Sequence, residues 1–375
     1  MIYLDSAATT LQKPASVARA SAWAINHLAS PGRGGHRPAM AAADTAFACR
    51  EEAASLFHVS EPERVVFTFN ATHGLNLAIH TLVKPGSRVV ISGYEHNAVT
   101  RPLHAIPNVT LTVLDTPPFQ PERMVEELKA ALAQGADVVI CNHVSNVFGC
   151  VQPVEEMAAL CVEAGVPFLL DASQSAGILP VRMDTLHAAF IAMPGHKGLY
   201  GPQGTGLLLC NHEAAPLLYG GTGSLSKLQT MPDMLPDRLE SGTHNMPGIA
   251  GLLEGIRYVQ RTGVETIAAH ERRLTAQAVA LLRQTEGIRL FWRDGLRHQT
   301  GVLSFVVEGV DCEELGEALA RQGIALRAGL HCAPLAHRTV GTLKTGTVRF
   351  SPSAFNTSQQ VVQFAQILQR TIRKM

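Results

Sequence analysis

The chain has 375 residues, of which 46% are hydrophobic and 17% are charged; this balance favours a globular protein of about two domains and excludes a disordered chain. Its 31 basic and 31 acidic residues give a formal net charge of zero, which excludes a strongly basic surface for nucleic acid or for an anionic membrane and favours a small-molecule partner. The sequence has no apolar run near the roughly 20 residues of a membrane span and no signal-peptide pattern at its start.

Short apolar runs alternate with segments of helical periodicity in the first part of the chain. The runs cover 65–69, 88–92, 109–114, 137–141, 166–170, 188–192 and 206–210. The helical segments between them include 72–83, 121–133 and 153–163. Apolar strands separated by helices are typical of a mainly parallel sheet with helices on both faces. This part of the chain is therefore predicted to form an α/β domain.

The pattern changes in the last third of the chain. A long helical region covers 248–284, with a break near Gly263. Further runs and helices follow at 301–307, 312–321, 324–327 and 357–374. This mixture predicts a smaller α+β domain. We expect residues 15–250 to form the large domain, and residues 1–14 together with 251–375 to form the small one.

The cysteines are odd in number and scattered along the chain. They are Cys49, Cys141, Cys150, Cys161, Cys210, Cys312 and Cys332. None belongs to a Cys-x-x-Cys pair, so neither a metal site nor a disulfide framework is expected. We therefore expect a cytoplasmic protein with free thiols.

Lys197 lies in a glycine-rich turn that follows the apolar run 188–192. Glycines on both sides let the backbone approach a ligand closely. A partly desolvated lysine in such a turn has a lowered pKa and acts as an amine nucleophile towards an aldehyde. The alternative is a surface lysine on a flexible loop. A phosphate-binding P-loop is disfavoured because the GxxxxGK[ST] pattern is absent.

Two further segments place polar groups where apolar runs end. Asp171 follows the run 166–170, at the strand end where α/β sheets bind ligands, and a carboxylate there is able to keep a pyridinium nitrogen protonated. Its alternative is an ordinary turn or helix-cap aspartate. The turn Asn70-Ala71-Thr72 precedes a helix, whose free N–H groups suit a phosphate, although threonine is also a common N-cap.

These residues belong to a longer set of motifs. The set begins at Tyr3-Leu4-Asp5-Ser6-Ala7-Ala8 and continues with Glu95-His96-Asn97, His143-Val144-Ser145-Asn146, Asp171-Ala172-Ser173-Gln174, Gly195-His196-Lys197, Glu240-Ser241-Gly242-Thr243, Arg327-Ala328-Gly329-Leu330-His331-Cys332-Ala333 and Arg349-Phe350-Ser351. In this order the motifs resemble the class V aminotransferase-like group of pyridoxal-5′-phosphate (PLP) enzymes, and within it the cysteine desulfurases and selenocysteine lyases. The resemblance implies the PLP-dependent transferase fold (fold type I), an α/β architecture with a mainly parallel seven-stranded sheet, helices on both faces, and a smaller α+β domain that carries the catalytic cysteine.

The resemblance implies a cofactor site for PLP. Lys197 would link covalently to the cofactor, and Asp171 would pair with its pyridine nitrogen. Gln174 would contact the ring hydroxyl oxygen, and His96 would stack on the ring face as a second catalytic residue beside the lysine. The phosphate would be held by Ala71, Thr72 and His196 and, from the neighbouring subunit of a homodimer, by Thr243.

The resemblance also implies a site for an amino-acid substrate. Asn146 and Arg349 would hold its carboxylate, a bidentate task that suits a guanidinium group. Arg327 and His36 would contribute to the same site. Cys332 would be the nucleophile that takes the sulfur.

The sequence around Cys332 reads as a loop. Arg327, His331 and His337 stand close to it and favour the thiolate, which is the reactive form. Most other cysteines stand in apolar strands or helices, where a thiol behaves as a small hydrophobe. Cys312 is the exception, because we expect it in the first turn of a helix, where the helix dipole lowers a thiol pKa.

The resemblance therefore implies a PLP-dependent cysteine desulfurase, which converts L-cysteine to L-alanine and carries the sulfur as a persulfide on Cys332 for a protein acceptor. A selenocysteine lyase, another class V lyase or aminotransferase that does not use Cys332, and a non-catalytic sulfur-relay scaffold remain open. At the lysine loop, Pro194 stands where many relatives have Ser or Thr, and Gly198 is inserted after Lys197. Neither change removes a catalytic group.

Overall fold

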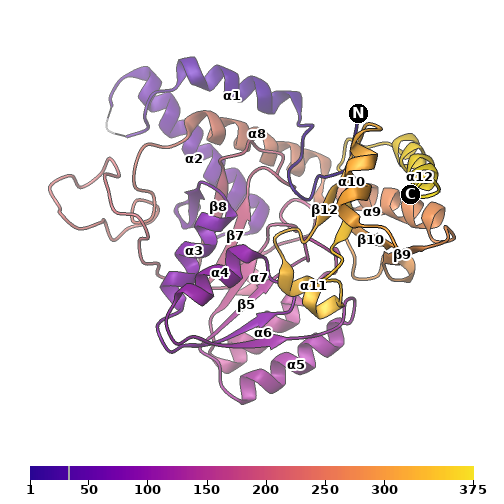
Figure 1. Ribbon diagram of the computed structural model, residues 1–375. Coiled ribbons are helices and arrows are strands. Elements are labelled where there is room, and N and C mark those ends of the chain that lie inside the picture. Colours follow the sequence, from indigo (N-terminus) through magenta and orange to yellow (C-terminus); the bar gives the residue numbers. More distant parts are fainter. Residues whose placement is uncertain (33) are drawn as a thin grey trace.

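The computed structural model describes residues 1–32 and 34–375 as a larger and a smaller body side by side (Figure 1). The larger body contains a seven-stranded sheet in the order β2-β8-β7-β6-β5-β3-β4. Its strands are β2 (Val65–Thr68), β3 (Arg88–Ser92), β4 (Thr110–Leu114), β5 (Val138–Asn142), β6 (Phe168–Asp171), β7 (Phe190–Pro194) and β8 (Gly206–Cys210). Strand β8 runs opposite to the other strands of this sheet and is antiparallel to both β2 and β7, whereas the remaining pairs are parallel. The predicted mainly parallel seven-stranded sheet is confirmed.

Helices cover both faces of this sheet. They are α1 (Ala15–His27), α2 (Arg37–Phe57), α3 (Ala71–Leu82), α4 (Asn97–Ala105), α5 (Pro121–Ala133), α6 (Val154–Ala164), α7 (Met183–Leu186) and α8 (Met246–Thr262). In β6, Phe168 and Leu170 pack in a core with α5 and α6, whereas Leu169 faces the opposite core with α3 and α4. Because both faces of the strand are buried, its sequence is a continuous apolar run.

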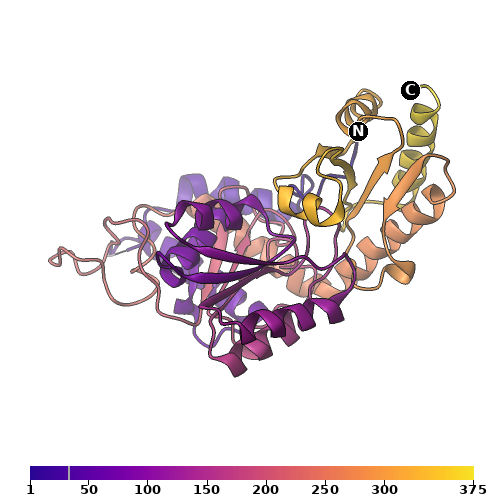
Figure 2. The same cartoon turned by 60° about the horizontal axis from the view of Figure 1, so that its bottom comes forward.

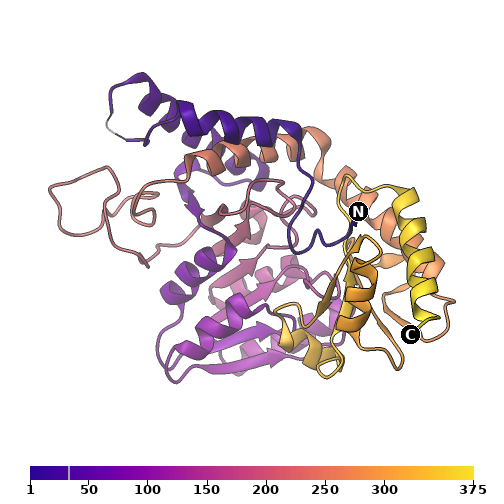
Figure 3. The same ribbon diagram turned by 45° about the horizontal axis from the view of Figure 1, so that its top comes forward.

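Helices α1 and α8 run side by side along one side of the larger body (Figure 3). Ile249, Leu252 and Ile256 of α8 pack in the same core as α2. Helix α8 ends at Gly263, which has a φ of +86°, a conformation that favours glycine. This glycine is the predicted break in the long helical region.

The smaller body contains a four-stranded antiparallel sheet in the order β12-β13-β10-β9. Its strands are β9 (Ile288–Phe291), β10 (Leu303–Val307), β12 (Arg327–Gly329) and β13 (Thr347–Phe350), and its helices are α9 (Val264–Leu282), α10 (Cys312–Ala320) and α12 (Ser358–Ile372). Helix α11 (Pro334–Val340) follows β12 and packs Ala336 in the core of the larger body. Both chain termini lie at this body (Figure 2). The first strand, β1 (Ile2–Tyr3), pairs in parallel with β11 (Ile324–Ala325).

The predicted division of the chain at residue 250 falls inside α8. Since the apolar residues of α8 pack in the large body as far as Ile256, we propose that the chain passes into the smaller body at Gly263. The expected run 324–327 is two strands of different sheets, β11 and β12, with Leu326 between them. No helix among the described residues has the length and apolar character needed to cross a membrane.

Candidate active site

A cavity of about 210 Å³ opens where the parallel strands end, the usual ligand position in α/β sheets. It offers many times the roughly 10–15 Å³ that one buried water needs. Sequence-predicted residues from both bodies line it. They are Ala71, Thr72, His96, Asn146, Asp171, Gln174, His196, Lys197, Arg327, Cys332 and Arg349.

Lys197 lies in the turn after β7, as its glycine-rich sequence predicts. Its carbonyl accepts hydrogen bonds from the Tyr200 N–H at 2.9 Å and from Thr10 Oγ1 at 3.3 Å. Burial lowers the pKa of the Lys197 amine to about 8; the Asp171 carboxylate opposes this shift, and the charge of Arg349 adds to it. An amine with this pKa is partly unprotonated near neutral pH and is therefore a competent nucleophile.

Asp171 and His96 line the cavity after two strands of the sheet, β6 and β3, which have β5 between them. Asp171 is the last residue of β6, and its Oδ1 accepts a hydrogen bond from the Ser173 N–H at 2.9 Å. His96 is the N-cap of α4, and its Nδ1 accepts from the Ala98 N–H at 3.0 Å. Burial, together with the charge of Lys197, lowers the pKa of His96. Its ring is therefore neutral near neutral pH, with the proton on Nε2.

Glu95 directly precedes His96 in the chain and is fully buried. Its Oε1 accepts hydrogen bonds from Ser92 Oγ at 2.5 Å and from the Asn142 N–H at 2.8 Å. Burial raises the pKa of Glu95 to about 8, and the charge of Asp171 acts in the same direction. Glu95 is therefore a neutral acid near neutral pH and adds no charge to the cavity.

The N-terminus of α3 supplies hydrogen-bond donors to the same cavity. Asn70 caps the helix, and its Oδ1 accepts from the His73 N–H at 2.9 Å. The N–H groups of Ala71 and Thr72 have no partner within the helix, and both residues line the cavity. His196 lies nearby, and burial lowers its pKa to about 4, so its ring is neutral. This set of donors suits an anion such as a phosphate.

Arg349 extends from β13 into the cavity wall and is 2% exposed. Its Nη1 donates to the Asn146 carbonyl at 2.8 Å, and its Nη2 donates to Asp5 Oδ1 at 2.7 Å. Arg349 Nε and Asn146 Oδ1 are buried without a hydrogen bond to any described residue. Because buried polar atoms are nearly always paired, these two atoms suit a polar ligand.

Cys332 is the exposed cysteine of the chain, and the other six are buried. It follows β12 in a turn with a φ of +56°, and its carbonyl accepts from the Asn97 N–H at 2.8 Å. The prediction that Cys332 lies in a loop is therefore confirmed. Its thiol stands at the rim of the cavity that Lys197 lines.

The electrostatic effects that we expected on the thiols of Cys332 and Cys312 are partly wrong. Burial lowers the pKa of His337 to about 4 and that of His331 well below its ordinary value, so neither ring is a cation that favours the Cys332 thiolate. Cys312 is the first residue of α10, as expected. However, burial raises the pKa of its thiol, and Asp311 acts in the same direction, so the expected lowering is wrong.

Comparisons with known proteins identify the family of this chain. Residues 2–364 match the family model described as Aminotransferase class-V. The chain belongs to the class-V aminotransferase family. A "Probable cysteine desulfurase" from Pyrococcus abyssi is 31% identical over 390 residues, which cover 100% of this chain and 95% of that protein.

Some relatives of this chain are longer. A "Probable cysteine desulfurase" from Mycolicibacterium paratuberculosis is 32% identical over 382 residues, which cover 99% of this chain and 55% of that protein. The chain spans 55% to 62% of the length of three such relatives. The apo structure of a cysteine desulfurase from Thermococcus onnurineus NA1 superposes with a TM-score of 0.90 at 30% identity, covering 100% of this chain and 95% of that one. The predicted family and its type I fold are confirmed.

Two predicted site residues lie outside the cavity. His36 is the exposed N-cap of α2, where its Nδ1 accepts from the Ala39 N–H at 3.4 Å. Thr243 is exposed and lines a different pocket, together with Phe67 of β2. The roles expected for these two residues stay predictions.

Asp5 is a polar residue of this site that the sequence reasoning did not single out. Its carboxylate pairs with both Arg349 and Arg327. The available signal was the N-terminal motif Tyr3-Leu4-Asp5, one of those on which the family resemblance rests.

Proposed function

We propose that this class-V aminotransferase relative is a PLP-dependent cysteine desulfurase that converts L-cysteine to L-alanine. One observation carries the proposal: the buried amine of Lys197 and the exposed thiol of Cys332 belong to the same cavity. An amine nucleophile suits an aldehyde cofactor, and an accessible thiol suits sulfur transfer. Relatives that are about 30% identical over the whole chain are named cysteine desulfurases.

The residues of the cavity fit PLP. Lys197 would hold the aldehyde carbon, and Asp171 would hold the pyridine nitrogen. Gln174 donates one N–H to the Ala7 carbonyl at 2.9 Å and keeps a second N–H for the ring hydroxyl oxygen. The phosphate would be held by Ala71, Thr72 and His196. When bound, PLP supplies an electron sink for chemistry at the α-carbon of an amino acid.

The remaining steps belong to side chains of this chain. Arg349 binds the substrate carboxylate through its buried Nε–H, which has no hydrogen-bond partner among the described residues. Asn146 donates one side-chain N–H to the His331 carbonyl at 2.8 Å and keeps a second N–H for the same carboxylate. Lys197, with a pKa of about 8, takes the α-proton onto Nζ and later returns it. Cys332 Sγ forms a bond to the substrate sulfur as the C–S bond of the substrate breaks, so that the sulfur stays on the protein as a persulfide. His96 would contact the bound cofactor with a neutral ring.

The proposal includes a homodimer and a protein that accepts the sulfur. Exposed apolar side chains gather on the long segment after β8, which extends away from the body (Figure 1). They include Leu217, Leu218, Tyr219, Leu225, Leu228 and Met234. Exposed apolar side chains in this number favour a protein partner, and Thr243, near the end of the same segment, would reach the phosphate of the neighbouring subunit. The exposed position of Cys332 suits transfer to an acceptor in the cytoplasm.

The test is to measure alanine and sulfide from L-cysteine with the purified, PLP-loaded protein and an added dithiol reductant, which reduces the persulfide and releases its outer sulfur as sulfide. We expect equal amounts of both products, and a persulfide on Cys332 in the absence of an acceptor. Cys332→Ala should keep the visible absorption of bound PLP and lose the persulfide, whereas the matched control Cys312→Ala should keep both. Alanine formation that survives in Cys332→Ala would favour a lyase or aminotransferase without a thiol step. Turnover of selenocysteine but not cysteine would favour a selenocysteine lyase.

A further inference from the structure

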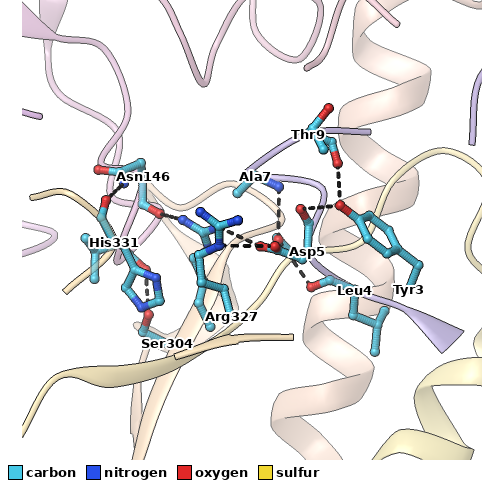
Figure 4. A network of polar contacts seen from close by, with 12 residues as sticks. Tyr3, Leu4, Asp5, Ala7, Thr9, Asn146, Ser304, Arg327 and His331 are labelled. Atoms are coloured by element: carbon cyan, nitrogen blue, oxygen red, sulfur yellow. Dashed lines mark hydrogen bonds and ion pairs between the residues drawn. The ribbon is translucent and has the colours of Figure 1, made fainter. Parts of the chain in front are cut away.

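Asp5 joins two arginines that face the cavity. Its Oδ1 accepts a hydrogen bond from Arg349 Nη2 at 2.7 Å, and its Oδ2 accepts one from Arg327 Nε at 3.2 Å. The two arginines stand directly opposite each other on β13 and β12. Like charges in this position are destabilising, so the bridging carboxylate is what keeps the two guanidinium groups side by side. Figure 4 shows Asp5 next to Arg327.

The carboxylate of Asp5 lies behind the arginines as seen from the cavity. Arg327 and Arg349 line the cavity, whereas Asp5 is absent from the described residues that do so. The side chain of Asp5 is 12% exposed and that of Arg327 is 50% exposed. A substrate carboxylate therefore meets the arginines from the open side and does not compete with Asp5 for space.

The backbone around Asp5 is held at both ends. The Ser6 N–H donates to the carbonyl of Ser351 at 3.0 Å, the residue that follows the end of β13 and stands two positions after Arg349. Further along, the Thr10 N–H donates to the His196 carbonyl at 3.1 Å, in the loop that carries the catalytic lysine. The N-terminal segment therefore connects the arginine strand to the lysine loop and fixes the direction of the Asp5 side chain.

We propose that Asp5 is the positioning residue of the substrate α-carboxylate site, because it holds Arg349 and Arg327 as one pair directed into the cavity. This inference rests on the proposed function, since it concerns how an amino-acid substrate is held. Asp5 acts through the arginines and touches neither substrate nor cofactor. Without its charge, Arg349 keeps one hydrogen bond, to Asn146, and Arg327 is free to turn towards solvent.

The test measures how tightly L-alanine binds, from the change that it causes in the visible spectrum of the PLP-loaded protein. L-Alanine has the α-carboxylate and no sulfur to transfer, so the readout is binding and not turnover. Asp5→Asn keeps the shape of the side chain and removes its charge. Tyr3→Phe is the matched control, because it removes the hydroxyl that donates to the Thr9 carbonyl at 2.8 Å in the same segment (Figure 4) and leaves the carboxylate in place.

We expect Asp5→Asn to weaken L-alanine binding about tenfold or more, the loss typical of one charge-assisted hydrogen bond. Tyr3→Phe should stay within about twofold of the wild type, because no arginine loses a partner. Asp5→Glu, which keeps the charge, should bind more tightly than Asp5→Asn. In all variants the spectrum without L-alanine should match that of the wild type, because the cofactor contacts are intact.

Unchanged or tighter L-alanine binding in Asp5→Asn overturns the proposal, even where the variant is less stable, because the role of Asp5 is then structural. Equal losses in Asp5→Asn and Asp5→Glu overturn it as well, since the charge is then not the cause. If Asp5→Asn does not fold, Arg327→Gln removes the exposed half of the same pair, and unchanged binding in that variant overturns the proposal. A wild type that responds to neither L-alanine nor L-cysteine rejects the proposed function itself.

Discussion

Glu271 provides a test of the electrostatics of this fold. It lies on α9, is 7% exposed, and faces a small second cavity that Ser6, Tyr200 and Thr300 also line. No side-chain hydrogen bond reaches its carboxyl group from the described residues, and burial alone raises its pKa from 4.5 to about 8. We predict that Glu271→Gln, which is neutral at every pH, changes how stability depends on pH.

The magnitude follows from the pKa shift. A raised carboxyl pKa in the folded state stabilises the protein fully below pH 4.5, and this contribution is lost as the pH rises towards 8. Within this window the unfolded chain has released its proton and the folded chain has not, so the free energy of unfolding falls by about 1.4 kcal/mol per pH unit. Between about pH 5.5 and about pH 7.5, the wild type should lose roughly 2.7 kcal/mol relative to Glu271→Gln.

The assay is urea unfolding of both proteins at these two pH values, at one protein concentration and with the cofactor bound. All other titrating groups are common to both proteins, so the difference between the two pH dependences isolates Glu271. Parallel pH dependences would refute the reasoning, because they would mean that Glu271 is already ionised in the folded protein and has a partner there.

Four further substitutions, one of them a control, test packing and capping. Arg50 and Glu240 form a buried ion pair at 2.6 Å, so Arg50→Met should lower the free energy of unfolding by about 3–5 kcal/mol. A Cβ at Gly198 would lie 2.3 Å from a backbone carbonyl oxygen, so Gly198→Ala should lower the free energy of unfolding by about 1–3 kcal/mol. The control is Gly221→Ala, whose Cβ meets open space. Its free energy of unfolding should stay within about 0.5 kcal/mol of the wild type. Thr357 caps α12 in a capping box, and Thr357→Ala should lower the thermal midpoint by the equivalent of about 1 kcal/mol.

Much of the large sheet was predictable because its strands are buried on both faces. The seven apolar runs match the seven strands within two residues at each end. The alanine-rich helices α1 and α2 were not predicted, because alanine is small, apolar and a strong helix former at once, and it leaves little periodic contrast. Strand β13 was missed because Arg349 interrupts its apolar pattern, although that side chain is buried and paired.

The candidate site was partly predictable from its motifs, since Lys197 and Asp171 both line the cavity. The protonation states of His331 and His337 could not be predicted from the sequence. They follow from burial, which depends on packing between distant segments. The Asp5–Arg349 pair joins residues 344 positions apart. Spacing along a chain does not reveal a contact of this kind.

Reduction with borohydride, digestion and mass spectrometry of the peptides would test the account most directly. Two amines are candidates, since burial lowers the pKa of Lys13 as well as that of Lys197 to about 8. Of the two, Lys197 lines the cavity of about 210 Å³ at the strand ends and Lys13 does not. We predict a pyridoxyl group on the peptide that contains Lys197 and an unmodified Lys13. A pyridoxyl group on Lys13, or on no lysine at all, would contradict the assignment of this cavity as the cofactor site.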